Sequence, residues 1–181
     1  MFEMITKADF AVLKFAESLH NPLLDMIMSA ITFLGDGAYL WIGIAIILLF
    51  IPKQRKTGVT VLVGLIVFHV VCNTGLKNII ARPRPFTLMP ELWNSIPAMV
   101  DIPKSFSMPS GHTMSSVLSA FLIGKNVDRL RIPTYVMAAL IAFSRIYVLV
   151  HYPSDVIVGA VLGVILGIII DKLFKLKKQT V

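Results

Sequence analysis

Thr57–Leu76, TGVTVLVGLIVFHVVCNTGL, is the stretch that decides the fold. It contains no Asp, Glu, Lys or Arg. A helix needs about 20 apolar residues to cross the hydrocarbon core of a bilayer, which is the length of this stretch. Within a membrane only a helix or a closed barrel satisfies its own backbone hydrogen bonds, and a continuous apolar run of this length indicates a helix. We therefore predict a transmembrane helix here.

Further apolar stretches lie on both sides of this one. The chain has 181 residues, of which 56% are hydrophobic and only 15% are charged, a balance unlike that of a soluble domain. The sequence predicts an all-α integral membrane helical bundle, one domain over residues 1–181, with six transmembrane helices in residues 21–178. The predicted spans are Leu23–Leu34, Ala38–Ile51, Thr57–Leu76, Thr113–Gly124, Ile132–Val150 and Val156–Ile170.

The N-terminal residues 1–20 have a different pattern. Over residues 7–19, Phe10 and Leu13 alternate with Lys7 and Lys14 near helical spacing. This pattern is typical of an amphipathic helix that lies on the membrane surface. Pro22 disfavours a helical conformation of the residue before it, so we expect the interfacial helix to end there.

Basic residues set the expected orientation. They cluster at 53–56, 125–131 and 172–178, which lie on one side of the membrane if there are six spans. The positive-inside rule makes that side, and both termini, cytoplasmic in a cell membrane. The loop 78–108 and the junction 151–155 are then outside. Because the net charge of +7 is spread over span ends, we expect no nucleic-acid partner.

The sequence Ser110-Gly111-His112 precedes an apolar helix. Ser110 is a good residue for capping a helix start, and free backbone N–H groups there bind anions. Gly111 allows a close approach to the backbone. The simpler interpretation is an ordinary helix cap with a histidine beside it.

His151 and Asp155 are four residues apart at the start of the last span. A carboxylate bound to one ring nitrogen fixes the tautomer of a histidine and leaves the other nitrogen free as a nucleophile. Alternatively, Asp155 only compensates the dipole of the helix that Pro153 starts.

Three cations lie near the outer ends of spans. Lys77, Arg84 and Arg145 together can neutralise a phosphoryl group, and an arginine presents a planar fork that matches phosphate. Arg82 has the same chemistry and is an alternative to Arg84. Long basic side chains also extend from span ends to the membrane surface without any ligand.

Taken together, these motifs resemble the signature of the type-2 phosphatidic acid phosphatase superfamily. Lys77, six residues, Arg84-Pro85 is similar to its first motif, and Pro109-Ser110-Gly111-His112 to its second. Ser144-Arg145, five residues, His151, three residues, Asp155 is similar to the third.

The resemblance implies a metal-independent phosphatase without a cofactor. It implies that His151 attacks phosphorus and forms a phosphohistidine, that Asp155 orients this ring, and that His112 protonates the leaving oxygen and then activates water. The resemblance also assigns the phosphoryl oxygens to five residues. These are Lys77, Arg84, Ser110, Gly111 and Arg145.

The expected substrate is a membrane lipid phosphate or pyrophosphate. Small bacterial relatives suggest undecaprenyl diphosphate, with phosphatidylglycerophosphate and phosphatidic acid as alternatives. A carrier of phosphorylated lipid and a haem protein are other hypotheses. His69 lies about two turns inside its span while His112 and His151 lie at helix ends, so they pair poorly as haem ligands. The oligomeric state stays open.

Three other features leave alternatives. His69, Asn73 and Lys77 share one helix face, which we expect inside the bundle. Gly159, Gly163 and Gly167 form a small-residue face, either for packing within the bundle or for a dimer. The apolar loop 86–108 is either a lid over the site or, through Trp93, an interfacial anchor.

Overall fold

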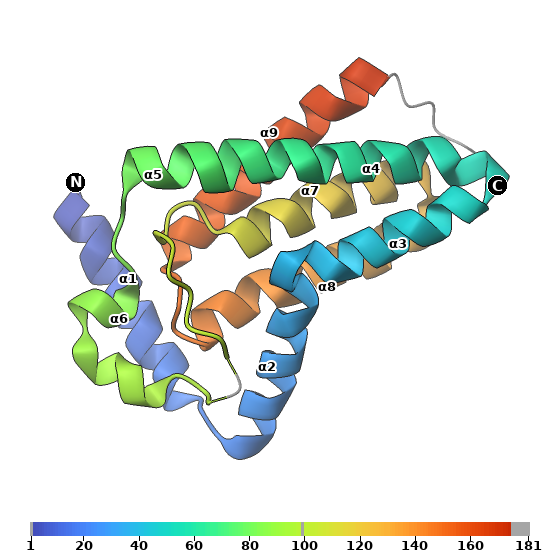
Figure 1. Ribbon diagram of the computed structural model, residues 1–181. Helices are drawn as coiled ribbons and strands as arrows, with labels where there is room; N and C mark the ends of the chain where they lie inside the picture. Colours follow the sequence, from blue (N-terminus) through green and yellow to red (C-terminus); the bar gives the residue numbers. More distant parts are fainter. Residues whose placement is uncertain (1, 99, 175–181) are drawn as a thin grey trace.

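The structure, a computed structural model, describes residues 2–98 and 100–174, without the side chains of residues 2–6 and 93. Its described residues are helical or irregular and contain no strand, which confirms the all-α prediction (Figure 1). The α-helices are α1 (Phe2–Ser18), α2 (Pro22–Gly35), α3 (Tyr39–Phe50), α4 (Arg55–Phe68), α5 (Lys77–Ile80), α6 (Pro85–Leu88), α7 (Gly111–Asn126), α8 (Asp128–Tyr147) and α9 (Pro153–Phe174). The other helical segments are η1 (Asp36–Ala38), η2 (Pro52–Gln54), the π-helical η3 (His69–Leu76) and η4 (Pro90–Ser95).

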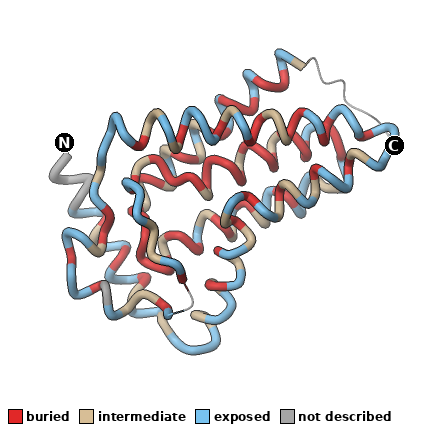
Figure 2. The backbone as a smooth tube through the Cα atoms, in the orientation of Figure 1, coloured by how far each residue is buried: buried red, intermediate tan, exposed pale blue. Residues whose placement is uncertain are grey.

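The core of the molecule is a bundle around α7. Figure 1 shows α3, α4, α7 and α8 running along the length of the molecule, with α9 crossing obliquely, while α1, α2, α5 and α6 lie toward one end. Helix α7 packs against α4, α8 and α9, and most of its residues are buried (Figure 2). Because α7 begins at Gly111, this arrangement places the predicted phosphate motif inside the bundle.

The glycine face of α9 packs within the bundle. A Cβ on Gly159 would lie 2.8 Å from the carbonyl oxygen of Ser110, and a Cβ on Gly163 would lie 2.8 Å from that of Met114. These separations are shorter than real Cβ contacts, so the glycines allow α9 to lie directly on the backbone of α7. The interpretation as internal packing is therefore confirmed.

A sharp bend separates α2 from α3. Asn21 caps α2, since its Oδ1 accepts a hydrogen bond from the Leu24 N–H at 3.0 Å, and Pro22 occupies the first turn. The helix ends at Gly35, and Gly37 and Ala38 then adopt left-handed φ angles of 55° and 58°. This turn redirects the chain into α3.

The bend corrects the prediction of six spans. At the start of α2, Asp25 accepts a 2.7 Å hydrogen bond from the hydroxyl of Tyr147, at the end of α8. Just after α2, Asp36 contacts His112, at the start of α7. Both ends of α2 thus lie at the same end of the bundle, so residues 22–50 make one passage along it. Leu23–Leu34 is not a separate span, because its short apolar helix leans against the end of α8.

Five helical units therefore run along the bundle within the described residues. They are α2–α3, α4–η3–α5, α7, α8 and α9. With five passages, α1 and the end of α9 at Phe174 lie at opposite ends. This arrangement of the described residues differs from the expectation that both termini lie on one side, and the side of the membrane on which each end lies stays a prediction. Lys175, Lys177 and Lys178, which belong to the basic cluster 172–178, lie outside the described residues.

Among the described residues, three helical stretches are long and apolar enough to cross a membrane: Pro22–Phe50, Pro52–Leu88 and Pro153–Phe174. Helix α7 has 16 residues and is about 24 Å long at ~1.5 Å per residue, somewhat less than the ~30 Å hydrocarbon core. Helix α8 carries ionisable residues near both ends, which lowers its mean hydropathy.

Helix α1 and the loop after α5 cover the end of the bundle where α7 begins. Leu13 and Ala16 of α1 are buried against Leu92, Leu149 and Tyr152. The predicted amphipathic helix thus exists, and its apolar face packs on protein. The segment 78–108 contains α5, α6 and η4, so it is partly helical. The side chain of Trp93, the predicted anchor, lies outside what the structure describes. The same holds for Met99 of this loop.

Candidate active site

Six of the eight predicted site residues line one cavity of about 840 Å³ at the covered end of the bundle. Its polar part is formed by Lys77, Arg84, Gly111, His112, Arg145 and His151. These residues come from four separate parts of the chain: α5 with the following loop, the start of α7, the end of α8 and the α8–α9 connection. The sequence prediction that these motifs converge is reproduced in the fold, while their chemical roles stay a prediction.

Lys77 and Arg84 are held by the loop segment that precedes α7. Both are buried, with 6% and 4% of their surface exposed. The Lys77 ammonium donates to the hydroxyl of Ser105 at 3.3 Å, and the Arg84 Nε–H donates to the Ser105 carbonyl at 2.7 Å. Ser105 therefore fixes the two cations side by side.

Arg145 enters the cavity from the last turn of α8. It is 2% exposed and donates a hydrogen bond to the hydroxyl of Thr32 on α2. Its buried Nε has no hydrogen-bond partner among the described residues. A buried guanidinium with an unused donor at a cavity wall is costly unless an anion binds there.

None of the three cations is neutralised by a carboxylate. Among the described side chains, the ion pairs involve other residues, and Lys77, Arg84 and Arg145 form none. Three unpaired buried positive charges around one cavity form a strong anion site.

His151 lies between a carboxylate and a cation. Its Nδ1 is 3.3 Å from Asp155 Oδ2, and its Nε2 is 3.2 Å from an Arg84 NH1 donor. The two partners assign the proton to Nδ1, which leaves the lone pair of Nε2 to accept from Arg84. Burial, and then the charges of Arg84, Arg145 and Lys77, hold the pKa of His151 well below its ordinary value. The lowered pKa favours the neutral ring, which is the form of imidazole that can act as a nucleophile.

His112 has a partner that sequence reasoning missed. Its Nε2 lies 2.6 Å from Oδ1 of Asp36, in the turn between α2 and α3, and both residues line the cavity. A signal was present in the sequence, because Asp36 is a lone charge between two apolar stretches. Gly35 allows the contact, since a Cβ there would lie 2.7 Å from Cδ2 of His112.

Asp155 and Ser110 stand behind the cavity wall. Asp155 is fully buried and reaches the site through His151. Ser110 caps α7, and its hydroxyl accepts a 3.0 Å hydrogen bond from Thr113. Of the two residues at this helix start, Gly111 lines the cavity and Ser110 does not, within the described residues. A phosphate contact of Ser110 stays a prediction.

Arg82 points away from the cavity. It forms ion pairs with Asp9 at 2.7 Å and with Asp155 at 2.6 Å. The structure thus places Arg84, and not Arg82, beside His151. Asp9 is a second residue that sequence reasoning missed, because it lies far from the motifs on the amphipathic helix.

The cavity continues from its polar part along an apolar wall. His69 and Asn73 of η3 line it together, and Asn73 Nδ2 lies 3.2 Å from His69 Nδ1. Beyond them the wall consists of apolar residues from α2, α3 and the α4–η3 helix. These are Phe33, Tyr39, Ile42, Leu62, Leu65, Ile66, Phe68 and Val70. Tyr39 and Ile66 are exposed, so the cavity reaches the lateral surface of the bundle.

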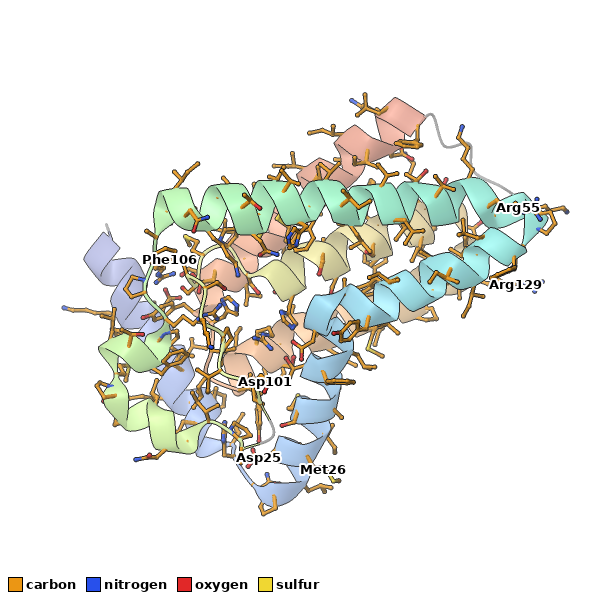
Figure 3. All side chains as sticks on the ribbon, viewed as in Figure 1. Asp25, Met26, Arg55, Asp101, Phe106 and Arg129 are labelled. Carbon is orange, nitrogen blue, oxygen red and sulfur yellow. The ribbon has the colours of Figure 1, made fainter. Side chains whose placement is uncertain are left out.

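The loop before α7 forms another wall of the cavity. Asp101, Ile102, Pro103 and Ser105 line it. In Figure 3, Asp101 and Phe106 lie at the covered end of the bundle, opposite Arg55 and Arg129. Part of the loop 86–108 therefore borders the site, and its movement as a lid stays a prediction.

Known proteins resemble this chain over about two thirds of its length or more. A decaprenylphosphoryl-5-phosphoribose phosphatase of Mycobacterium tuberculosis is 30% identical over 174 residues, covering 94% of this chain and 93% of the relative. An undecaprenyl-diphosphatase of Sulfolobus acidocaldarius is 32% identical over 126 residues, covering 69% of this chain and 59% of that protein. The crystal structure of a transmembrane PAP2-type phosphatidylglycerolphosphate phosphatase from Bacillus subtilis superposes with a TM-score of 0.76 at 28% identity, covering 98% of this chain and 90% of that one.

The characteristic profile of the PAP2 superfamily, the type-2 phosphatidic acid phosphatases, matches residues 57–178. This match contains every motif residue that lines the polar part of the cavity. The chain belongs to the PAP2 superfamily of metal-independent membrane lipid phosphatases.

Proposed function

We propose that this protein hydrolyses a lipid phosphate or diphosphate through a phosphohistidine on His151. One observation carries the proposal: Lys77, Arg84 and Arg145 are buried without carboxylate ion pairs around the cavity that His151 lines, and Arg84 lies 3.2 Å from Nε2 of His151. A phosphoryl group supplies the missing negative charge, and the same cations stabilise the charge that develops in its transition state.

The first step joins His151 to phosphorus. Nε2 attacks, the bond from phosphorus to the leaving oxygen breaks, and His112 gives its proton to that oxygen. Asp155 keeps Nδ1 protonated and offsets the positive charge that forms on the ring. The cations and the N–H of Gly111, at the start of α7, hold the phosphoryl oxygens.

The second step releases phosphate. His112, now without its proton, removes a proton from water as the water oxygen attacks phosphorus. The bond between phosphorus and Nε2 breaks, and the electron pair returns to His151. Asp36 fits this exchange because its contact with His112 stabilises the protonated ring.

The cavity supports a lipid as the substrate. Its polar part lies next to the apolar wall that contains Ile42, Leu62 and Ile66, and it reaches the lateral surface of the bundle at Tyr39. The phosphate of a lipid can therefore bind the three cations while the apolar chain of the lipid lies along α3 and α4, toward the bilayer.

Undecaprenyl diphosphate is the substrate that we propose first. The Sulfolobus relative is an undecaprenyl-diphosphatase, and the three cations match the high charge of a diphosphate. Phosphatidylglycerophosphate is the alternative, because the Bacillus structure that covers 98% of this chain is a phosphatidylglycerolphosphate phosphatase. Phosphatidic acid is a third member of the test panel.

We propose that the site faces outward from the cell membrane. Arg55 and Arg129 lie at the opposite end of the bundle from the site (Figure 3), and basic ends of spans favour the cytoplasmic side. In this orientation α1 is outside and the end of α9 is cytoplasmic.

A phosphate-release assay in detergent tests the proposal. Wild-type protein is given undecaprenyl diphosphate, phosphatidylglycerophosphate and phosphatidic acid, each with and without EDTA, and a His151→Ala variant serves as the control. We expect release from at least one lipid, unchanged by EDTA and abolished in the variant. Full activity of His151→Ala would contradict the phosphohistidine route. Binding of these lipids without phosphate release from any of them would support a carrier instead.

A further inference from the structure

Helix α1 is fastened to the active-site end of the bundle by one buried carboxylate. Asp9 is 3% exposed, although it lies on an amphipathic helix. Its Oδ1 accepts the Ser154 N–H at 2.9 Å, and its Oδ2 accepts the Ser154 hydroxyl at 2.5 Å. Asp9 thereby caps the start of α9, the helix that carries Asp155.

The same carboxylate holds Arg82. An Arg82 NH2 group donates to Asp9 Oδ2 at 2.7 Å, and NH1 donates to Asp155 Oδ1 at 2.6 Å. The guanidinium also lies 3.9 Å from the centre of the Tyr152 ring. Two carboxylates and an aromatic face thus fix the fork of Arg82 in one orientation.

Each oxygen of Asp155 has a separate role in this arrangement. Oδ1 accepts from Arg82, while Oδ2 accepts from the Ser107 hydroxyl at 2.8 Å, the Tyr152 N–H at 3.0 Å and Nδ1 of His151 at 3.3 Å. The carboxylate cannot rotate without losing several of these bonds. The orientation of Nε2 of His151 therefore depends on the position of Arg82.

We propose that Asp9 and Arg82 are positioning residues for the phosphatase reaction, acting on His151 through Asp155. Asp9 fixes the guanidinium, which fixes Asp155. Asp9 also offsets the charge of Arg82, so Asp155 keeps a net negative charge beside the ring to stabilise the phosphohistidine. The interfacial helix is in this way part of the catalytic machinery.

This inference rests on the proposed function but can fail separately from it. Neither Asp9 nor Arg82 lines the cavity within the described residues. Their loss therefore acts on the chemical step and leaves lipid binding intact, which separates kcat from KM.

The experiment compares two conversions of a carboxylate to an amide on the same helix. Asp9→Asn breaks the ion pair with Arg82. Glu17→Gln is the matched control, because Glu17 holds α1 to Ser95 of η4 and does not contact the Asp155 network. Phosphate release is measured with the lipid that wild-type protein hydrolyses best, and thermal unfolding in detergent is followed for each variant.

We expect Asp9→Asn to lower kcat about 10-fold, the smaller end of what loss of a supporting partner costs, with KM unchanged. Glu17→Gln should keep both kinetic constants. Wild-type kcat in Asp9→Asn overturns the inference. Equal losses of kcat in both variants also overturn it, since α1 then acts only as structural support. An inactive wild-type protein contradicts the proposed function instead.

Arg82→Lys provides a second measurement if Asp9→Asn does not fold. Lysine keeps the positive charge but cannot donate to two carboxylates in a planar fork. We expect a lower kcat with an unchanged KM and near-normal unfolding. A lysine variant with wild-type kcat overturns the inference.

Discussion

At the scale of single residues, the unused donor of Arg145 is the clearest sign of chemistry. Its Nε is buried and unpartnered within the described part of the chain, while a second guanidine nitrogen binds Thr32. A buried donor without a partner costs free energy, and a phosphoryl oxygen would accept its hydrogen bond. The residue therefore belongs to the transition-state contacts that we propose.

Replacement of Arg145 tests this assignment. We expect Arg145→Ala to lower kcat by about 10²–10³-fold, as loss of one transition-state donor does. Arg131→Ala is the control, because Arg131 lies at the other end of α8 and pairs with Asp128. Unchanged phosphate release by Arg145→Ala would show that the side chain does not contact the phosphate.

Gly35 is required for the position of His112. An added Cβ would lie 2.7 Å from the His112 ring and 2.8 Å from Ile141, so we expect Gly35→Ala to displace the ring. A displacement of about 1 Å can cost about 10²-fold in rate. Gly43→Ala is the control, since a Cβ there has nothing within 4 Å. Equal kcat in the two variants would mean that His112 does not need this contact.

At the scale of elements, the contact between α7 and α9 positions the two halves of the site. His112 lies at the start of α7, and Asp155 lies in the first turn of α9. The backbone N–H of Ser110 donates to the carbonyl of Asp155 at 3.1 Å, which fixes the two helix starts to each other. The small residues along α9 allow this close approach.

Gly163→Ala should destabilise this contact. Its Cβ would meet the Met114 carbonyl at 2.8 Å, and overpacking of this kind costs about 1–3 kcal/mol of unfolding free energy. Gly43→Ala has free space and should stabilise the protein by up to about 1 kcal/mol through helix propensity. Chemical denaturation of both variants in detergent measures the opposite signs, and a stabilised Gly163→Ala would contradict the packing.

The π-helical segment η3 is a second feature at this scale. Regular α-helical spacing predicts that His69, Asn73 and Lys77 share a face, and all three line the cavity. The local widening of the helix was not predictable, because propensities do not separate π from α geometry. Insertions of this type occur mostly at functional sites, and here the segment ends at Leu76, directly before Lys77.

At the scale of the whole molecule, the number of passages decides the side of each terminus. The structure has α1 at the active-site end and Phe174 at the other end, in contrast to the six-span prediction. Arg55 and Arg129 lie at one end of the bundle, and they share a side of the membrane whether the chain makes five passages or six. The positive-inside rule therefore favours the same orientation of this end in both arrangements.

Cysteine labelling of intact cells measures this topology. In a Cys72→Ala background, we expect Ala8→Cys on α1 and Lys104→Cys in the loop to react with an impermeant reagent from outside. Lys53→Cys, at the far end of the bundle, should react only after the cells are opened. Reaction of Ala8→Cys and Lys53→Cys from the same side would restore the six-span arrangement.

The sequence by itself determined the helical membrane class, the positions of the helices and the residues of the phosphate motifs. An apolar stretch of sufficient length specifies a transmembrane helix. The spacing of Lys77, Arg84, His112, Arg145 and His151 along the chain is read directly from the sequence. These are local properties, which one stretch of chain carries without its neighbours.

Only the tertiary structure decided the partners of these residues. Asp36 meets His112 across 76 positions of the chain. Asp9 meets Ser154 across 145 positions and reaches Asp155 through Arg82. No periodicity connects residues so far apart, because their contact depends on how α1 and α2 lie against the end of the bundle. The same packing turned the predicted first span into a helix that supports the active site.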